Sequence, residues 1–166
     1  MTILIGEDCV SSSSSTPIMY CDFLTTTPLQ LSATPQLVTT FTDTVPPENV
    51  TRTLGDITWG KGGVVSLSLE RIYRNNDQNP TNDAVYVTID VHKQGVSLFT
   101  RTLPLSTATS PTEPSIVSFT STGLRIVEEG DTFEIYVSAT DGASAEPQDV
   151  ELIFMRMAGT IVPSSL

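Results

Sequence analysis

Basic side chains are scarce in this chain of 166 residues, which carries 8 Lys and Arg against 19 Asp and Glu and a formal net charge of -11 at pH 7. Nucleic-acid binding needs Lys and Arg contacts to phosphate, and docking on anionic lipid needs positive charge as well. We therefore expect neither a nucleic acid nor a membrane as a partner. No stretch approaches the roughly 18 apolar residues of a membrane helix, and residues 1–6 lack the basic start of a secretory signal peptide.

Residues that commonly perform catalysis or bind metals are also few, with two Cys and one His. Cys9 and Cys21 are expected to be free thiols in a reducing compartment, and two cysteines alone make no zinc site. His92 lies two residues from Asp90, which would place both on one strand face and permit an acid–base pair. We favour a surface histidine, because no glycine-rich nucleophile elbow accompanies the pair. We predict no catalytic residue, no cofactor and no enzymatic activity, with a hydrolase as the alternative.

Two acidic or amide-rich segments could hold Ca²⁺, which prefers carboxylate and amide oxygens. One is the cluster of Glu128, Glu129 and Asp131 at a turn, and the other is the polar loop 75–83. Neither follows the regularly spaced carboxylates of a preformed calcium loop. We favour solvated turns, and we predict no metal site.

Apolar and polar residues alternate along several segments, and no segment of comparable length shows a helical period. In one of them, Phe133, Ile135, Val137 and Ala139 alternate with more polar residues. This period of two is typical of a strand with one buried and one solvated face. The pattern predicts an all-β fold, an antiparallel β-sandwich of about eight or nine strands. Strands are expected over 36–43, 50–59 (one irregular strand or two short pieces), 64–73, 84–93, 96–103, 115–120, 124–127, 131–139 and 150–157.

Residues 1–35 differ from the rest of the chain. They contain five consecutive serines, Ser11–Ser15, which bury nothing and cost backbone entropy to order. We predict an extended N-terminal arm over 1–35 and a β-sandwich over 36–166. Short apolar patches on the arm would anchor a partner protein, and a tail without a role is the alternative. The predicted anchors are Ile3, Leu4, Ile5, Tyr20, Phe23 and Leu24.

The last expected strand carries apolar residues on both faces. One face would hold Leu152 and Phe154, and the other Ile153, Met155 and Met157. A strand that is apolar on both faces must be covered on both. We predict that Ile153, Met155 and Met157 form a subunit interface, where the flexible Met side chains fill an irregular seam. Cover by a loop or arm of the same chain is the alternative.

Trp59 is the only tryptophan, and it precedes the glycine-rich loop 60–63. Exposed beside that loop, it would stack on sugar rings; buried, it would be a core residue at the end of a strand. We favour the buried position. The alternative ligand site is a shallow surface built from Trp59, Tyr73, Asn76 and Asp77.

Two segments carry a resemblance to a known family. Residues 82–91 read Asn-Asp-Ala-Val-Tyr-Val-Thr-Ile-Asp-Val, and residues 124–139 read Leu-Arg-Ile-Val-Glu-Glu-Gly-Asp-Thr-Phe-Glu-Ile-Tyr-Val-Ser-Ala. With the long Pro/Ser/Thr loop between them and a closing apolar strand, this order resembles the later half of tumour-necrosis-factor/C1q-like jelly rolls. In that family a Gly-Asp strand follows a turn, as Gly130 and Asp131 do here.

The resemblance implies an antiparallel jelly roll whose final strand lies close to a threefold axis. Such modules occur on tailed-phage virions as capsid decoration (cement) proteins, head fibres and tail-fibre tips. The implied function is that of a virion structural protein, a homotrimer that binds the major capsid protein and stabilises the outer surface of a phage head. It would be made in the host cytoplasm and reside on the virion surface, where its acidity faces away from packaged DNA. A receptor- or carbohydrate-binding fibre tip is the alternative.

Overall fold

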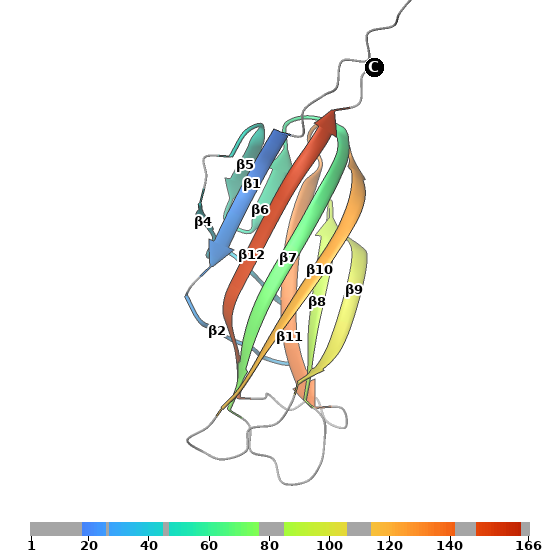
Figure 1. Ribbon diagram of the computed structural model, residues 1–166. Helices are drawn as coiled ribbons and strands as arrows, with labels where there is room; N and C mark the ends of the chain where they lie inside the picture. Colours follow the sequence, from blue (N-terminus) through green and yellow to red (C-terminus); the bar gives the residue numbers. More distant parts are fainter. Residues whose placement is uncertain are drawn as a thin grey trace, which may run out of the picture.

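Two antiparallel β-sheets pack face to face in this protein (Figure 1). The computed structural model describes residues 18–25, 27–44, 47–76, 85–105, 114–141 and 149–163. Within these ranges every regular element is a strand, which confirms the predicted all-β antiparallel sandwich. No helix in the described part of the chain has the length and apolar character needed to cross a bilayer.

Each sheet contains six strands. The first sheet has the order β10-β7-β12-β1-β4, with β2 paired to β12. Its strands are β1 (Ile18–Thr25), β2 (Leu29–Gln30), β4 (Thr42–Asp43), β7 (Gly63–Asn75), β10 (Ser115–Val127) and β12 (Val150–Pro163). The second sheet has the order β5-β6-β11-β8-β9, with β3 paired to β11. Its strands are β3 (Gln36–Leu37), β5 (Val50–Thr53), β6 (Asp56–Trp59), β8 (Val85–Lys93), β9 (Val96–Leu105) and β11 (Thr132–Asp141).

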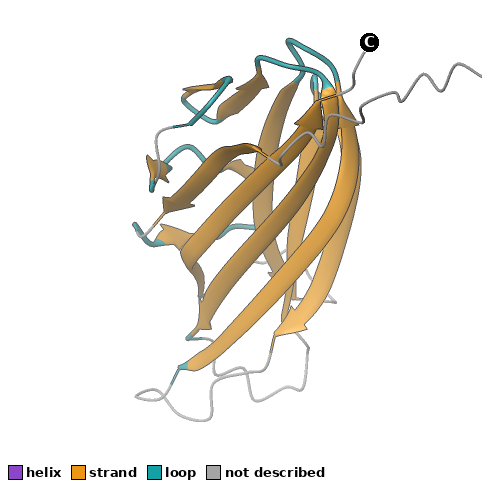
Figure 2. Cartoon of the chain, turned by 45° about the horizontal axis from the view of Figure 1, so that its top comes forward, coloured by secondary structure: helices purple, strands orange, loops and turns teal. Residues whose placement is uncertain are grey.

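The core lies between the sheets and follows from the alternation in the long strands. Figure 2 shows those strands lying side by side with a common twist, as right-handed strand twist dictates. The inward residues of β11 are buried, and Phe133, Ile135 and Val137 each have only 1 % of their surface exposed. Trp59 packs edge-on against Phe133, with ring centroids 6.0 Å apart. The favoured core position of Trp59 is therefore confirmed, because none of its surface is exposed (0 %).

The described residues form twelve strands, more than the eight or nine predicted from the sequence. The segment 36–43 does not form one strand but contributes β3 and β4 to different sheets. The segment 50–59 divides into β5 and β6 at Leu54, whose φ of 55° lies in the left-handed region, as does the φ of 53° at Asn49. The two pieces expected over 115–127 are one strand, β10, which continues through Gly123.

The N-terminal boundary of the sandwich also needs correction. Residues 18–25 form β1, which lies between β12 and β4 in the first sheet. Leu31 is buried with 2 % exposure, so the segment after β1 contributes to the core as well. The predicted arm over 1–35 therefore cannot extend beyond Ile18, and Ile3, Leu4 and Ile5 lie outside the described residues.

Three of the predicted anchors, Tyr20, Phe23 and Leu24, lie on β1. Phe23 is paired with Met157 on one side and with Asp43 on the other, and Leu24 is likewise paired on both sides. Their backbone groups are thus engaged within the sheet and are not free to add a strand to another protein. Phe23 and Leu24 therefore cannot anchor a partner by adding a strand, and anchoring through apolar side chains of Tyr20, Phe23 and Leu24 stays a prediction.

Candidate functional site

The outer face of the first sheet carries the largest group of exposed apolar side chains in the described residues. Along β10 the side chains alternate regularly between half-buried and exposed. The exposed positions on this strand include Ile116, Leu124 and Ile126, with exposed fractions of 55 %, 67 % and 77 %. Val64 on the neighbouring β7 adds a fourth, with 43 % exposed.

Strand register brings three of these residues into one patch. Ile126 lies opposite Val64, and Leu124 lies one pleat away, opposite Ser66. We call Val64, Leu124 and Ile126 the apolar patch. Cross-strand neighbours on one face lie about 5 Å apart, so these side chains form a contiguous surface.

The rest of this outer face bears few charges. The face continues across β7 and β12, where Ser68 lies opposite Ala158 and Ser66 lies opposite Thr160. Its charged positions on β7 and β12 form two cross-strand pairs of opposite charge, Glu70 with Arg156 and Arg74 with Glu151. A face of small, hydroxylated and apolar side chains costs less to remove from water than a charged face does, provided that its hydroxyl groups find hydrogen-bond partners. Its chemistry suits contact with another protein surface rather than binding of a small polar ligand.

The subunit interface predicted on β12 is not available at Met155 and Met157. Met155 and Met157 have exposed fractions of 0 % and 4 % and pack in the core of their own chain. The cause is a β-bulge, a register shift between Leu152 and Phe154 that reverses the alternation after Ile153. Leu152 and Met155 therefore both face inward, and Met155 and Met157 cannot form a subunit interface.

The predicted sugar-binding surface is not assembled either. Trp59 and Tyr73 are buried, and burial raises the pKa of Tyr73 to about 12. The Tyr73 ring lies 6.0 Å from the ring of Phe119 inside the sandwich. Asn76 is bound to Asp149, with its backbone N–H 2.9 Å from the Asp149 carbonyl oxygen. Asp77 lies outside the described residues.

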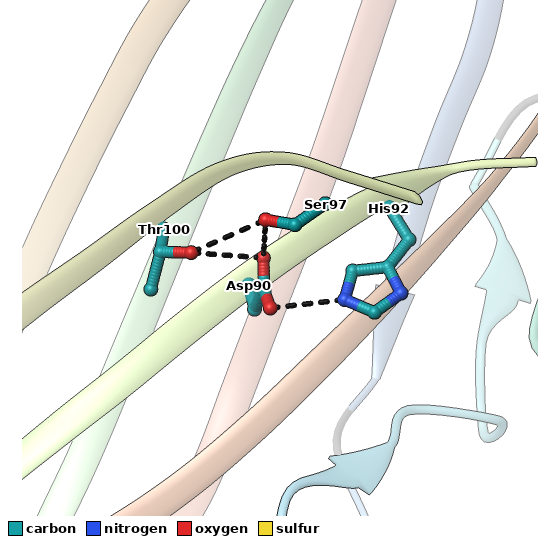
Figure 3. Close-up of polar contacts among 4 residues, drawn as sticks. All are labelled: Asp90, His92, Ser97 and Thr100. Carbon is teal, nitrogen blue, oxygen red and sulfur yellow. Dashed lines mark hydrogen bonds and ion pairs between the residues drawn. The ribbon is translucent and has the colours of Figure 1, made fainter. Parts of the chain in front are cut away.

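Asp90 and His92 form the pair that their spacing permits, although a surface histidine was favoured, and two hydroxyl groups join them (Figure 3). His92 Nε2 lies 2.9 Å from Asp90 Oδ2, and Ser97 Oγ donates to Asp90 Oδ1 at 2.6 Å. Thr100 Oγ1 donates to the same oxygen at 3.1 Å. Burial by itself would raise the pKa of Asp90, but the hydrogen bonds from Ser97, His92 and Thr100 outweigh it and lower that pKa.

This cluster lacks the geometry of nucleophilic catalysis. In a catalytic triad the hydroxyl bonds the imidazole, and the carboxylate bonds the other ring nitrogen. Here Ser97 and His92 bind the same carboxylate instead, so the imidazole does not accept the Ser97 proton. The His92 ring also packs against Tyr136, with centroids 4.6 Å apart. The arrangement fastens β9 to β8 and β8 to β11.

The acidic turn that could have held Ca²⁺ is organised around Asp131. The Asp131 side chain is 4 % exposed and forms an ion pair with Lys93 Nζ at 2.6 Å. It also accepts hydrogen bonds from the Glu128 backbone N–H at 2.7 Å and from Gln94 Nε2 at 3.2 Å. Both carboxylate oxygens thus have partners from the chain itself. Among the described residues no group of three or more His, Cys, Asp or Glu is placed to hold a metal ion.

No protein-family model matches the chain, and no curated protein matches it in sequence. Its fold is similar to that of a solved structure titled "Structure of Eiger TNF from S. frugiperda", with a TM-score of 0.54 and 15 % sequence identity. The similarity covers 90 % of this chain and 96 % of that chain. The chain therefore has a tumour-necrosis-factor-like jelly-roll fold, as the resemblance in the sequence implies.

Proposed function

We propose that the chain is a non-enzymatic structural protein that self-associates through the outer face of its first sheet and decorates the outer surface of a phage head as a trimer. The apolar patch carries this proposal, because Leu124 and Ile126 each expose more than half of their surface, 67 % and 77 %. Contiguous exposed apolar patches often mark sites of contact with another protein. A second copy of the chain would cover it.

Three copies around one axis would cover this outer face, which an isolated monomer leaves in water. β12 lies between β7 and β1 in the middle of the sheet. A threefold contact through the outer face would therefore bring β12 close to the axis, where the family resemblance also places the final strand. Small side chains such as Ala158 and Thr160 would allow close approach of the sheets there.

The head surface is proposed on the family resemblance and on charge. A net charge of -11 keeps the protein away from packaged DNA and favours the exterior of a shell. Contact with the major capsid protein is assigned to the apolar segment Ile3–Ile5 that precedes β1. Three such segments on one trimer would raise the effective concentration of each contact, so weak single contacts would give firm attachment.

Light scattering on Ile126→Glu and Val96→Glu tests the self-association. Both residues are exposed and β-branched, with 77 % and 70 % of their surface accessible, but Val96 lies on the second sheet. The native protein and Val96→Glu should have about three times the mass of one chain, whereas Ile126→Glu should be largely monomeric at micromolar concentration because a buried, unpaired carboxylate is costly. A monomeric native protein would contradict the proposal, as would an Ile126→Glu variant that stays trimeric.

The place on the virion is tested by truncation and by counting copies. A variant lacking residues 1–17 keeps β1 and should remain trimeric, but it should fail to coat capsids. Quantitative mass spectrometry of purified virions should find the full chain at a level near that of the shell subunit. Normal coating by the truncated variant would refute the anchoring segment. A level far below that of the shell subunit would favour a fibre tip over a decoration protein.

A further inference from the structure

An open-sided cleft of about 420 Å³ lies between the two sheets where the edge strands β9 and β10 face each other. Its volume falls within the range of small-molecule sites, about 300–1,000 Å³. The floor is apolar and comes from both sheets. It includes Leu67, Leu69 and Met157 of the first sheet and Val91, Phe133 and Ile135 of the second. Arg101 and Arg125 line the cleft together with hydroxyl groups of β10.

A buried arginine stands beside this cleft. Arg71 is 1 % exposed and donates from Nη2 to Ser121 Oγ, a group that lines the cleft, at 2.8 Å. Its Nε and Nη1 have no hydrogen-bond partner among the described residues. Its neighbours on the inward face of β7 are Leu69 and Tyr73, and Met155 lies opposite it on β12. The pKa of Arg71 is lowered by this burial, so its surroundings disfavour the charge that it carries.

The other two arginines also have no carboxylate partner among the described residues. Arg125 lies with its guanidinium 5.2 Å from the centroid of the Phe99 ring, and its Nη1 donates to the Leu124 carbonyl oxygen at 2.8 Å. Arg101 lies close enough to Arg71 to repel it, which adds to the effect of burial on the Arg71 pKa. The ion pairs found among the described residues use other basic groups, at Arg52, Arg74, His92 and Lys93.

Three arginines without counter-charges are unusual in so acidic a chain, which has 8 Lys and Arg in all. The backbone makes room for one of them, because a Cβ on Gly123 would lie 3.2 Å from Arg125 Nη1. Guanidinium groups bind carboxylates through paired N–H donors, and an uncompensated buried charge is relieved by an anion. The floor of the cleft is apolar, so a ligand that fills the cleft also needs an apolar part, which a bare inorganic ion lacks.

We infer that this cleft binds a small amphipathic anion, a carboxylate attached to an apolar chain or ring. The carboxylate would meet Arg101 and Arg125, and the positive charge of Arg71 behind Ser121 would add to the attraction, while the apolar part would cover the floor. This site is independent of the proposed self-association, which uses the opposite, outward side of β10.

Calorimetric titration of the full chain with 4-phenylbutyrate tests the inference, with neutral 4-phenylbutanol and inorganic sulfate as comparisons. Phenylbutyrate should bind at least about tenfold more tightly than the alcohol, because charge-assisted hydrogen bonds to arginine are lost with the alcohol. It should also bind more tightly than sulfate. Equal binding of the alcohol would overturn the role of the arginines, and equal binding of sulfate would overturn the amphipathic class. Absence of phenylbutyrate binding would overturn the site.

Variants locate the binding in the cleft. Arg101→Gln and Arg125→Gln should each weaken phenylbutyrate binding by roughly fivefold or more. Arg71→Met should also weaken binding, yet raise the melting temperature of the ligand-free protein, because it replaces a buried charge with an apolar group. Arg52→Met is the matched control, since Arg52 pairs with Asp43 at 2.9 Å and does not line the cleft. Equal loss in Arg52→Met, or no loss in both rim variants, would refute the assignment.

Discussion

Replacing Asp131 with Ala should lower the free energy of unfolding by about 3 kcal/mol. The Asp131 carboxylate is 4 % exposed and has three partners, Lys93, Gln94 and the backbone N–H of Glu128. A hydrogen bond to a charged group contributes about 1.5–3 kcal/mol when its donor is stranded. Lys93 is 29 % exposed and regains water when the carboxylate is removed, so the three contributions do not add in full.

Urea unfolding at one fixed protein concentration measures this loss, with Asp131→Asn as the matched variant. The amide keeps an acceptor for the Glu128 N–H but loses the ion pair with Lys93, so its cost should be about half that of Ala, roughly 1.5 kcal/mol. The Ala variant should melt about 6–12 °C lower, at roughly 2–4 °C per kcal/mol for a chain of this size. An Ala variant within about 0.5 kcal/mol of the native protein would refute the reasoning, because it would mean that solvent replaces the carboxylate freely.

Three further outcomes are expected. Met157→Ala should cost about 2–4 kcal/mol in urea unfolding, because it opens a cavity in the core, and it should leave the mass by light scattering unchanged. The hydrogen bonds to Asp90 lower its pKa, so its ionised form stabilises the protein at any pH above the unfolded pKa of about 3.9. This stabilisation is lost as the pH falls through the lower folded pKa. The melting temperature of Asp90→Asn should therefore lie below that of the native protein near neutral pH, and the two should converge in strong acid. Gly55→Ala should lower the melting temperature, because its Cβ would lie 2.6 Å from Leu37 Cγ; an unchanged value would mean that Leu37 moves without cost.

The long central strands were predictable because every second residue is buried and the apolar residues recur at the same spacing in the sequence. Ile89 and Val91 on β8 and Ile135 on β11 are buried, as the alternation requires. The two-residue strands such as β2 and β3 were not predictable, because pairing with a distant strand, rather than local pattern, defines them. A segment of two residues is too short to show an alternating pattern of apolar and polar residues.

The bulge in β12 shows why Met155 and Met157 were predicted on the wrong face of that strand. A period of two says which residues share a face, but a single bulge residue exchanges the faces for the remainder of the strand. The bulge at Ile153 is not marked by a glycine or proline, so the sequence offers no sign of it. A sign of the cleft was present, however, because Arg71 continues the inward series of Leu69 and Tyr73 in place of an apolar residue.

The pairing of β1 with β12 has a consequence for how the chain must fold. Ile18 is matched with Ile161, so β1 cannot form this pairing until a strand far along the chain has been synthesised. β7 also pairs with β12, so the first sheet cannot form completely before β12 is synthesised. Structures dominated by such distant pairings fold slowly, since loop closure must precede the gain from contact. A nascent polypeptide halted before residue 150 would thus lack β12, and the inward faces of β1 and β7 would stay without their shared partner strand.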